Sequence, residues 1–83
     1  MTQTPAEALD ILSRTIALVT FAENNGTLRT VLCTRSPTLI HFAGATEMME
    51  KPTDRENNIA VFDLHTGERT EFSSDRLIDC REA

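Results

Sequence analysis

The segment from residue 58 to residue 78 constrains the fold most, because it has the pattern of a complete β-ribbon. It begins with the strand-forming residues IAVF at positions 59–62, followed by the turn residues His65, Thr66 and Gly67. Gly67 can adopt the positive φ angle that a bulged hairpin loop requires. The chain returns as residues 68–72, in which only Phe72 is strongly apolar. A return strand with one solvent-exposed face is typical of an antiparallel sheet.

The end of this segment predicts a tight turn into a last strand. Ser73, Ser74 and Asp75 carry side-chain oxygens that accept hydrogen bonds from nearby backbone N–H groups. Leu77 and Ile78 follow and are expected to form the final strand.

A second hairpin is predicted upstream, with strands at residues 16–22 and 27–34. Asn25-Gly26 between two β-branched and apolar runs is a strong hairpin signal. Because the first strand has apolar residues on both faces, we expect it to lie inside the sheet or under a helix. The alternation places Val19, Phe21, Val31 and Cys33 on one face and Leu18, Leu28 and Leu32 on the other.

The N-terminal residues predict a helix from residue 5 to about residue 13. Thr4 is placed as N-cap, Pro5 as first helical residue and Glu7 to complete a capping box. A helix this short is marginal alone, so we expect it to lean on the sheet and close one end of it. Its apolar side consists of Ala8, Leu9, Ile11 and Leu12.

Residues 36–58 form a connection that is long for a compact domain, so it is expected to hold a short strand or a helical turn, or to make functional contacts. A helical turn at residues 45–51, with Met48 and Met49 exposed at its end, is one interpretation. The apolar patch of Leu39, Ile40 and Phe42 either adds to the core, which we favour, or makes functional contacts.

The whole chain, residues 1–83, is predicted to be one mainly β domain. Its expected parts are an N-terminal helix at 1–14, a first hairpin at 15–35, an irregular connection at 36–58, and a second hairpin with the final strand at 59–80. About five short antiparallel strands with a tight turn before the last favour a small SH3-like half-open barrel.

Charge and composition restrict the classes of partner. The net charge of −5 disfavours non-specific nucleic-acid binding through phosphate neutralisation. The sequence has no apolar run long enough to cross a bilayer and no signal-peptide pattern, so a cytoplasmic location without membrane association is expected. In that compartment Cys33 and Cys80 are expected to be buried thiols rather than a disulfide.

Two stretches resemble known families. Residues 19–40, VTFAENNGTLRTVLCTRSPTLI, resemble the first hairpin of small SH3-fold proteins of tailed bacteriophages, and residues 59–78, IAVFDLHTGERTEFSSDRLI, resemble their closing segment. The second stretch is also similar to the C-terminal part of WYL domains. The phage resemblance implies a small accessory protein that acts by binding. The WYL resemblance implies a ligand- or nucleic-acid-sensing module and nominates Arg29, Arg69 and Arg76 as contacts.

No catalytic or metal-binding pattern emerges from the remaining residues. His41, His65, Cys33 and Cys80 are scattered singly, whereas a zinc site needs three or four such ligands together. A Cys33–His41 nucleophilic pair is disfavoured, because Cys33 falls within a strand and suits a core. We therefore expect neither a cofactor nor enzymatic activity.

Three binding hypotheses remain. The leading one is a non-enzymatic module that binds or inhibits a host protein in the cytoplasm through residues 36–58, using Leu39, Phe42, Met48 and Met49. The alternative is ligand or nucleic-acid binding by Arg29, Arg69 and Arg76. If the two hairpins lie side by side, Arg29 and Arg69 project from neighbouring strands, where they can hold a phosphate or carboxylate. Pairing of these arginines with Glu68, Glu71 or Asp75 across the sheet is favoured over such a ligand site. The third is homodimerisation through the connection.

Overall fold

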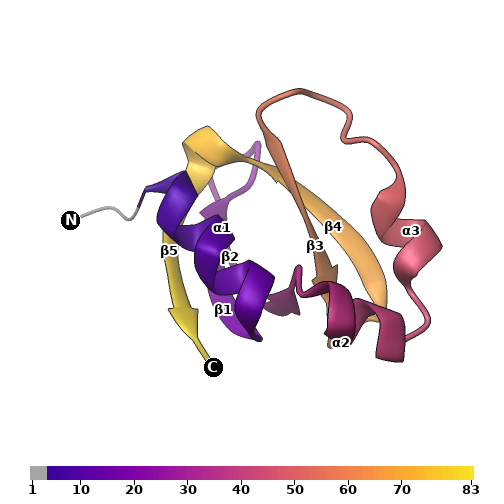
Figure 1. The fold of residues 1–83 in the computed structure, drawn as a ribbon. Helices are drawn as coiled ribbons and strands as arrows, with labels where there is room; N and C mark the ends of the chain where they lie inside the picture. The colour runs from indigo at the N-terminus through magenta and orange to yellow at the C-terminus, as the bar shows by residue number, and fades with distance from the viewer. Residues whose placement is uncertain (1–3) are drawn as a thin grey trace.

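The computed structural model describes residues 4–83, so the first three residues of the predicted N-terminal segment lie outside it. The described part is mainly β with a short N-terminal helix, which confirms the predicted fold class (Figure 1). Its elements are α1 (Pro5–Arg14), β1 (Ala17–Ala22), β2 (Leu28–Thr34), α2 (Pro37–Phe42), α3 (Thr46–Glu50), β3 (Asn58–Asp63), β4 (Glu68–Ser73), the 3-10 helix η1 (Ser74–Arg76) and β5 (Leu77–Glu82).

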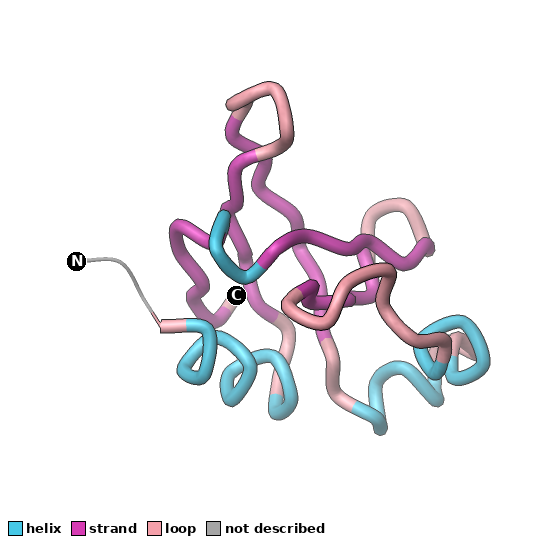
Figure 2. Tube along the Cα trace, turned by 90° about the horizontal axis from the view of Figure 1, so that it is seen from above, coloured by secondary structure: helices cyan, strands magenta, loops and turns pink. Residues whose placement is uncertain are grey.

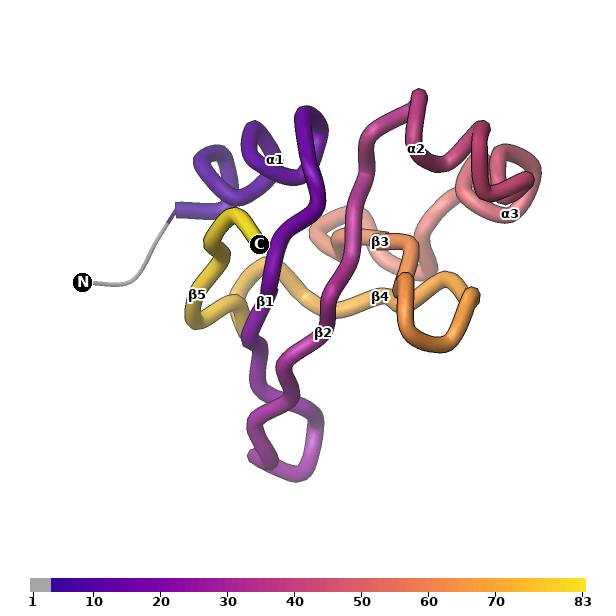
Figure 3. Tube along the Cα trace, turned by 90° about the horizontal axis from the view of Figure 1, so that it is seen from below, coloured from indigo at the N-terminus to yellow at the C-terminus, as the bar shows by residue number. Residues whose placement is uncertain are grey.

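The strands form one antiparallel sheet in the order β4-β3-β2-β1-β5. Strands β2 and β3 share only the pairs Cys33↔Asp63 and Thr34↔Phe62, so the two hairpins diverge beyond this point. The tip of the β1–β2 hairpin extends away from the rest of the molecule (Figures 2 and 3).

The sheet curls into the expected half-open barrel. The three-residue helix η1 returns the chain from β4 to β5, which pairs with β1. Phe21 on β1 and Phe72 on β4 stack with ring centroids 4.5 Å apart, although β2 and β3 lie between their strands in the sheet order. This contact closes the two hairpins over a shared core.

The main core lies inside this curl. As predicted, Val19, Phe21, Val31 and Cys33 are buried, whereas Leu18, Leu28 and Leu32 lie on the exposed face. Strand β1 lies between β2 and β5, which fits the expected interior position. The core cluster consists of Ala8, Leu12, Ala17, Val19, Phe21, Val31, Cys33, Ile59, Val61, Phe72, Leu77 and Cys80.

Helix α1 begins as its capping signal predicts. The Glu7 backbone N–H donates to Thr4 Oγ1 over 3.3 Å, and Pro5 is the first helical residue. Ala8 and Leu12 are buried against the core, and the helix contacts β5 and β2. The buried Thr34 hydroxyl donates to the Thr15 carbonyl oxygen over 2.9 Å, which ties the end of the helix to the sheet.

The connection forms two short helices, α2 and α3, which cover the outer face of β3. Ser36 caps α2 by accepting a hydrogen bond from the Leu39 N–H, and Pro37 is the first helical residue. Ile40, Ala45 and Phe62 form a second buried cluster there. Strand β3 is therefore buried on both faces, with Val61 in the main core and Phe62 in this second cluster.

Two expectations about the connection are wrong. Phe42 does not add to the core, because its position at the end of α2 leaves it 82% exposed, whereas Ile40 is buried as the core interpretation requires. Met48 and Met49 are not exposed at the end of a helical turn; they are half-buried because they pack against the second cluster.

Candidate functional site

The α2–α3 surface, defined as Leu39, Phe42, Met48 and Met49, contains the most exposed large apolar side chain of residues 4–83, that of Phe42. The other three side chains are half-buried. His41 lies beside Phe42, with ring centroids 6.4 Å apart in an edge-on arrangement. This surface therefore presents an aromatic ring that the fold itself does not cover.

Arg69 anchors this surface to the sheet. Its guanidinium group donates hydrogen bonds to the carbonyl oxygens of Met48 and Pro52, each over 3.1 Å, and to that of Lys51. The side chain is only 12% exposed. Because the Met48 carbonyl belongs to α3 and the other two directly follow it, Arg69 on β4 fixes the position of that helix.

Glu71, also on β4, attaches the end of the connection to the sheet. Its carboxylate accepts hydrogen bonds from the Asp54 backbone N–H over 3.0 Å and from the Asn58 side chain over 3.1 Å, and it pairs with Arg69 over 3.2 Å. The backbone hydrogen bond from Asp54 is the main cause of a lowered pKa of Glu71, and the bonds from Asn58 and Arg69 act in the same direction. Strand β4 thus holds the connection at several points along its length.

The structure does not bring the three nominated arginines together. Arg29 is on β2 and Arg69 is on β4, and β3 lies between these strands, so the expectation that they are neighbours is wrong. Arg76, in η1, donates to the Glu23 carbonyl oxygen over 2.9 Å. Arg29 and Arg76 instead line one groove, and Arg69 is committed to the connection.

Arg29 lies close to two carboxylates, but they are not Glu68, Glu71 or Asp75, which the pairing hypothesis named; of those pairs the structure forms Arg69–Glu71. The Arg29 guanidinium is 3.8 Å from Glu23 and 3.7 Å from Asp63, and it lies over the Phe21 ring at 5.9 Å. Asp63 also caps the β3–β4 turn, because its carboxylate accepts hydrogen bonds from the His65 and Thr66 N–H groups over 2.8 and 3.3 Å.

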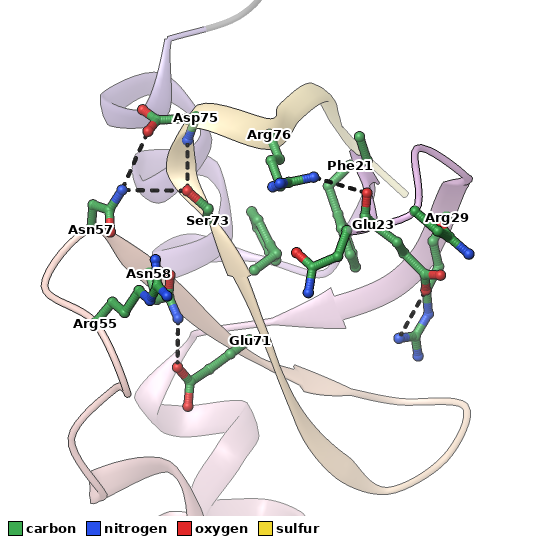
Figure 4. Close-up of a pocket in the computed structure, with 14 residues that line it drawn as sticks. Phe21, Glu23, Arg29, Arg55, Asn57, Asn58, Glu71, Ser73, Asp75 and Arg76 are labelled. Atoms are coloured by element: carbon green, nitrogen blue, oxygen red, sulfur yellow. Dashed lines mark hydrogen bonds and ion pairs between the residues drawn. The ribbon is translucent and has the colours of Figure 1, made fainter.

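A groove with a volume of about 1110 Å³ lies between the first hairpin and the end of the second (Figure 4). Sequence reasoning missed both the groove and the presence of Arg55 in it. No local signal marks Arg55, because it comes from the irregular stretch before β3. The groove is lined by Phe21, Ala22, Glu23, Asn24, Asn25, Arg29, Arg55, Asn57, Asn58, Glu71, Phe72, Ser73, Asp75 and Arg76.

Both cysteines are buried thiols outside any disulfide, which confirms that prediction. Burial is the main cause that raises the pKa of the Cys33 thiol to about 12, and Cys80 and Asp63 raise it further. Cys33 is therefore protonated at neutral pH, whereas a thiol nucleophile must ionise. His41 is exposed on α2, and Cys33 lies in the main core.

Two further findings concern the part of the chain that the structure describes, residues 4–83. It contains no group of three or more His, Cys, Asp and Glu side chains placed to hold a metal ion. None of its helices is long and apolar enough to span a membrane.

Comparisons with known proteins give no family assignment. No protein-family model matches the chain, and searches of curated proteins and of solved structures find no match either.

Proposed function

We propose that this protein is a non-enzymatic binding module that captures a protein partner through the α2–α3 surface. The observation that carries this proposal is the 82% exposure of Phe42 at the end of α2, a helix that packs on Phe62 of β3 through Ile40. Exposed aromatic rings are common anchors of protein interfaces. The neighbouring methionines are adaptable side chains that suit a partner surface of irregular shape.

The anchoring by Arg69 favours binding. Helix α3, which carries Met48 and Met49, is already fixed by hydrogen bonds to β4 and therefore loses less conformational entropy when a partner covers it. This use of Arg69 also favours the protein-binding hypothesis over a ligand site that includes Arg69.

The charges beside the surface define the chemistry of the partner. Glu47 and Glu50 on α3 are exposed, and Lys51 follows them. A complementary partner has an apolar pocket for the Phe42 ring and basic side chains that face α3.

The origin and location of the interaction are part of the proposal. The resemblance of residues 19–40 and 59–78 to small SH3-fold proteins of tailed bacteriophages supports a phage accessory protein that binds or inhibits a host protein in the cytoplasm. The partner in this account is a protein of the bacterial host.

The variant Phe42→Asp tests this proposal. We expect it to abolish capture of the partner, because a charged aspartate replaces the ring that the apolar pocket of the partner is proposed to bury. The measurement is an affinity capture from host lysate with quantitative mass spectrometry, followed by titration of the purified partner.

The matched control is Leu28→Asp, which replaces another exposed apolar side chain, 61% exposed, at the start of β2. Proteins captured by the native chain and by Leu28→Asp, but not by Phe42→Asp, support the proposal. Identical capture by all three chains contradicts it. If sedimentation detects a dimer that only Phe42→Asp dissociates, the surface instead binds a second copy of the chain.

A further inference from the structure

The groove of Figure 4 gathers arginines from three separate parts of the chain. Arg29 comes from β2, Arg55 from the end of the connection and Arg76 from η1. In the close-up, Arg55 lies at one end of the groove near Asn57 and Asn58, Arg29 lies at the other end, and Arg76 extends between them.

The acidic side chains of the groove already have partners. Glu71 accepts hydrogen bonds from Asp54 and Asn58, and it pairs with Arg69. Asp75 accepts from the Asn57 side chain over 3.4 Å, and Glu23 is 3.8 Å from Arg29. Asp75 is therefore the one carboxylate lining the groove that no arginine of residues 4–83 pairs with.

Two of the three arginines have no acidic partner. Among residues 4–83, neither Arg55 nor Arg76 forms an ion pair. Arg76 donates to a backbone carbonyl, that of Glu23, which leaves other donors of its guanidinium group available. The groove therefore offers charged donors that match carboxylate groups.

We propose that this groove binds an acidic peptide segment, with carboxylates of the peptide held by Arg55 and Arg76. Asn24, Asn25, Asn57 and Asn58 line the same groove. The Nδ2 groups of Asn57 and Asn58 donate to Asp75 and Glu71, and each amide carries further donors and acceptors that suit a peptide backbone. The site shares no residue with the α2–α3 surface, so it is a second binding site independent of the function proposed above.

The groove fits a nucleic-acid strand less well. Single-stranded nucleic acids bind through exposed aromatic rings, but Phe21 and Phe72 are buried beneath this groove. A continuous phosphate backbone carries a negative charge on every nucleotide, whereas only Arg55 and Arg76 of the groove lack ion pairs among residues 4–83 and the whole chain carries a net charge of −5.

The proposal is tested by titrating the isotope-labelled full chain with a synthetic peptide of alternating glutamate and serine, followed by NMR. We expect chemical-shift changes at the amides of residues 22–25, 55–58 and 73–76. The double variant Arg55→Gln/Arg76→Gln is expected to bind about tenfold more weakly, as for the loss of two exposed arginine–carboxylate contacts.

Arg81→Gln is the matched control, because it removes the same charge from an exposed arginine that pairs with Asp79 on β5. Equal weakening by Arg81→Gln and by the double variant contradicts the proposal, since it indicates a general charge effect. The absence of groove shifts at millimolar peptide also overturns it. Equal shifts with a glutamine–serine peptide, or tighter binding of oligothymidylate at the same amides, reject an acidic peptide as the ligand.

Discussion

Replacing Phe72 with alanine is expected to lower the free energy of unfolding by about 3–5 kcal/mol. The Phe72 ring is 5% exposed and stacks on Phe21, with centroids 4.5 Å apart. Because β2 and β3 pair over a short length, this contact is a main connection between the two hairpins. The substitution removes it and leaves a cavity in the core. Urea denaturation followed by circular dichroism measures the loss.

The matched control is Phe42→Ala, which removes the same ring from the surface. It is expected to change the free energy of unfolding by no more than about 0.5 kcal/mol. A domain with about 5–15 kcal/mol of stability has little reserve, so Phe72→Leu provides a milder substitution if Phe72→Ala does not fold. Equal losses for the variants at positions 42 and 72 would show that the curled core is incorrectly described.

Replacing Arg69 with methionine is expected to cost about 2–3 kcal/mol, which is the range for loss of hydrogen bonds to a charged group. Methionine keeps much of the apolar stem but cannot donate to the carbonyl oxygens of Met48, Lys51 and Pro52. We also expect faster amide hydrogen exchange at residues 46–52, because α3 loses its attachment to β4. Exchange in β1 and β2 should change much less.

Arg81→Met is the control for this substitution, because the Arg81 side chain is 74% exposed and pairs with Asp79 at the molecular surface. We expect it to change stability by no more than about 0.5 kcal/mol and to leave α3 exchange unaltered. Unchanged exchange at residues 46–52 in Arg69→Met would mean that α3 is held by other contacts.

The two hairpins could be predicted because their signals are local. Strand-forming residues flank each turn, and Gly26 and Gly67 occur where the chain reverses. The φ angles of these glycines, 85° and 74°, are positive, as the turns require. The helix α1 was predictable for the same reason, since Thr4 and Pro5 mark its first turn.

Helix α2 was missed although it carries a similar signal. Ser36-Pro37 repeats the Thr4-Pro5 pattern of a capping hydroxyl before a first-turn proline. Helix α2 has only six residues, Pro37 included, which are too few to display a helical period, so the apolar patch gave no indication of which side chains face the sheet. In the structure Ile40 faces the sheet, and Phe42, at the end of the helix, is exposed.

The roles of the arginines depend on contacts between distant parts of the chain. Arg69 is 17 to 21 residues away from the carbonyl groups that it binds. Arg55 and Arg76 meet at the groove only because the sheet curls and η1 returns the chain toward β1. The spacing of residues in the sequence alone does not predict these long-range contacts.

The most direct test of the proposed binding function is an NMR titration of the labelled chain with the purified host partner. We predict that the amide shifts concentrate at residues 37–51, which contain α2 and α3, and that Phe42→Asp abolishes them. Shifts confined to the exposed face of β1 and β2, with residues 37–51 unaffected, would contradict binding through the α2–α3 surface.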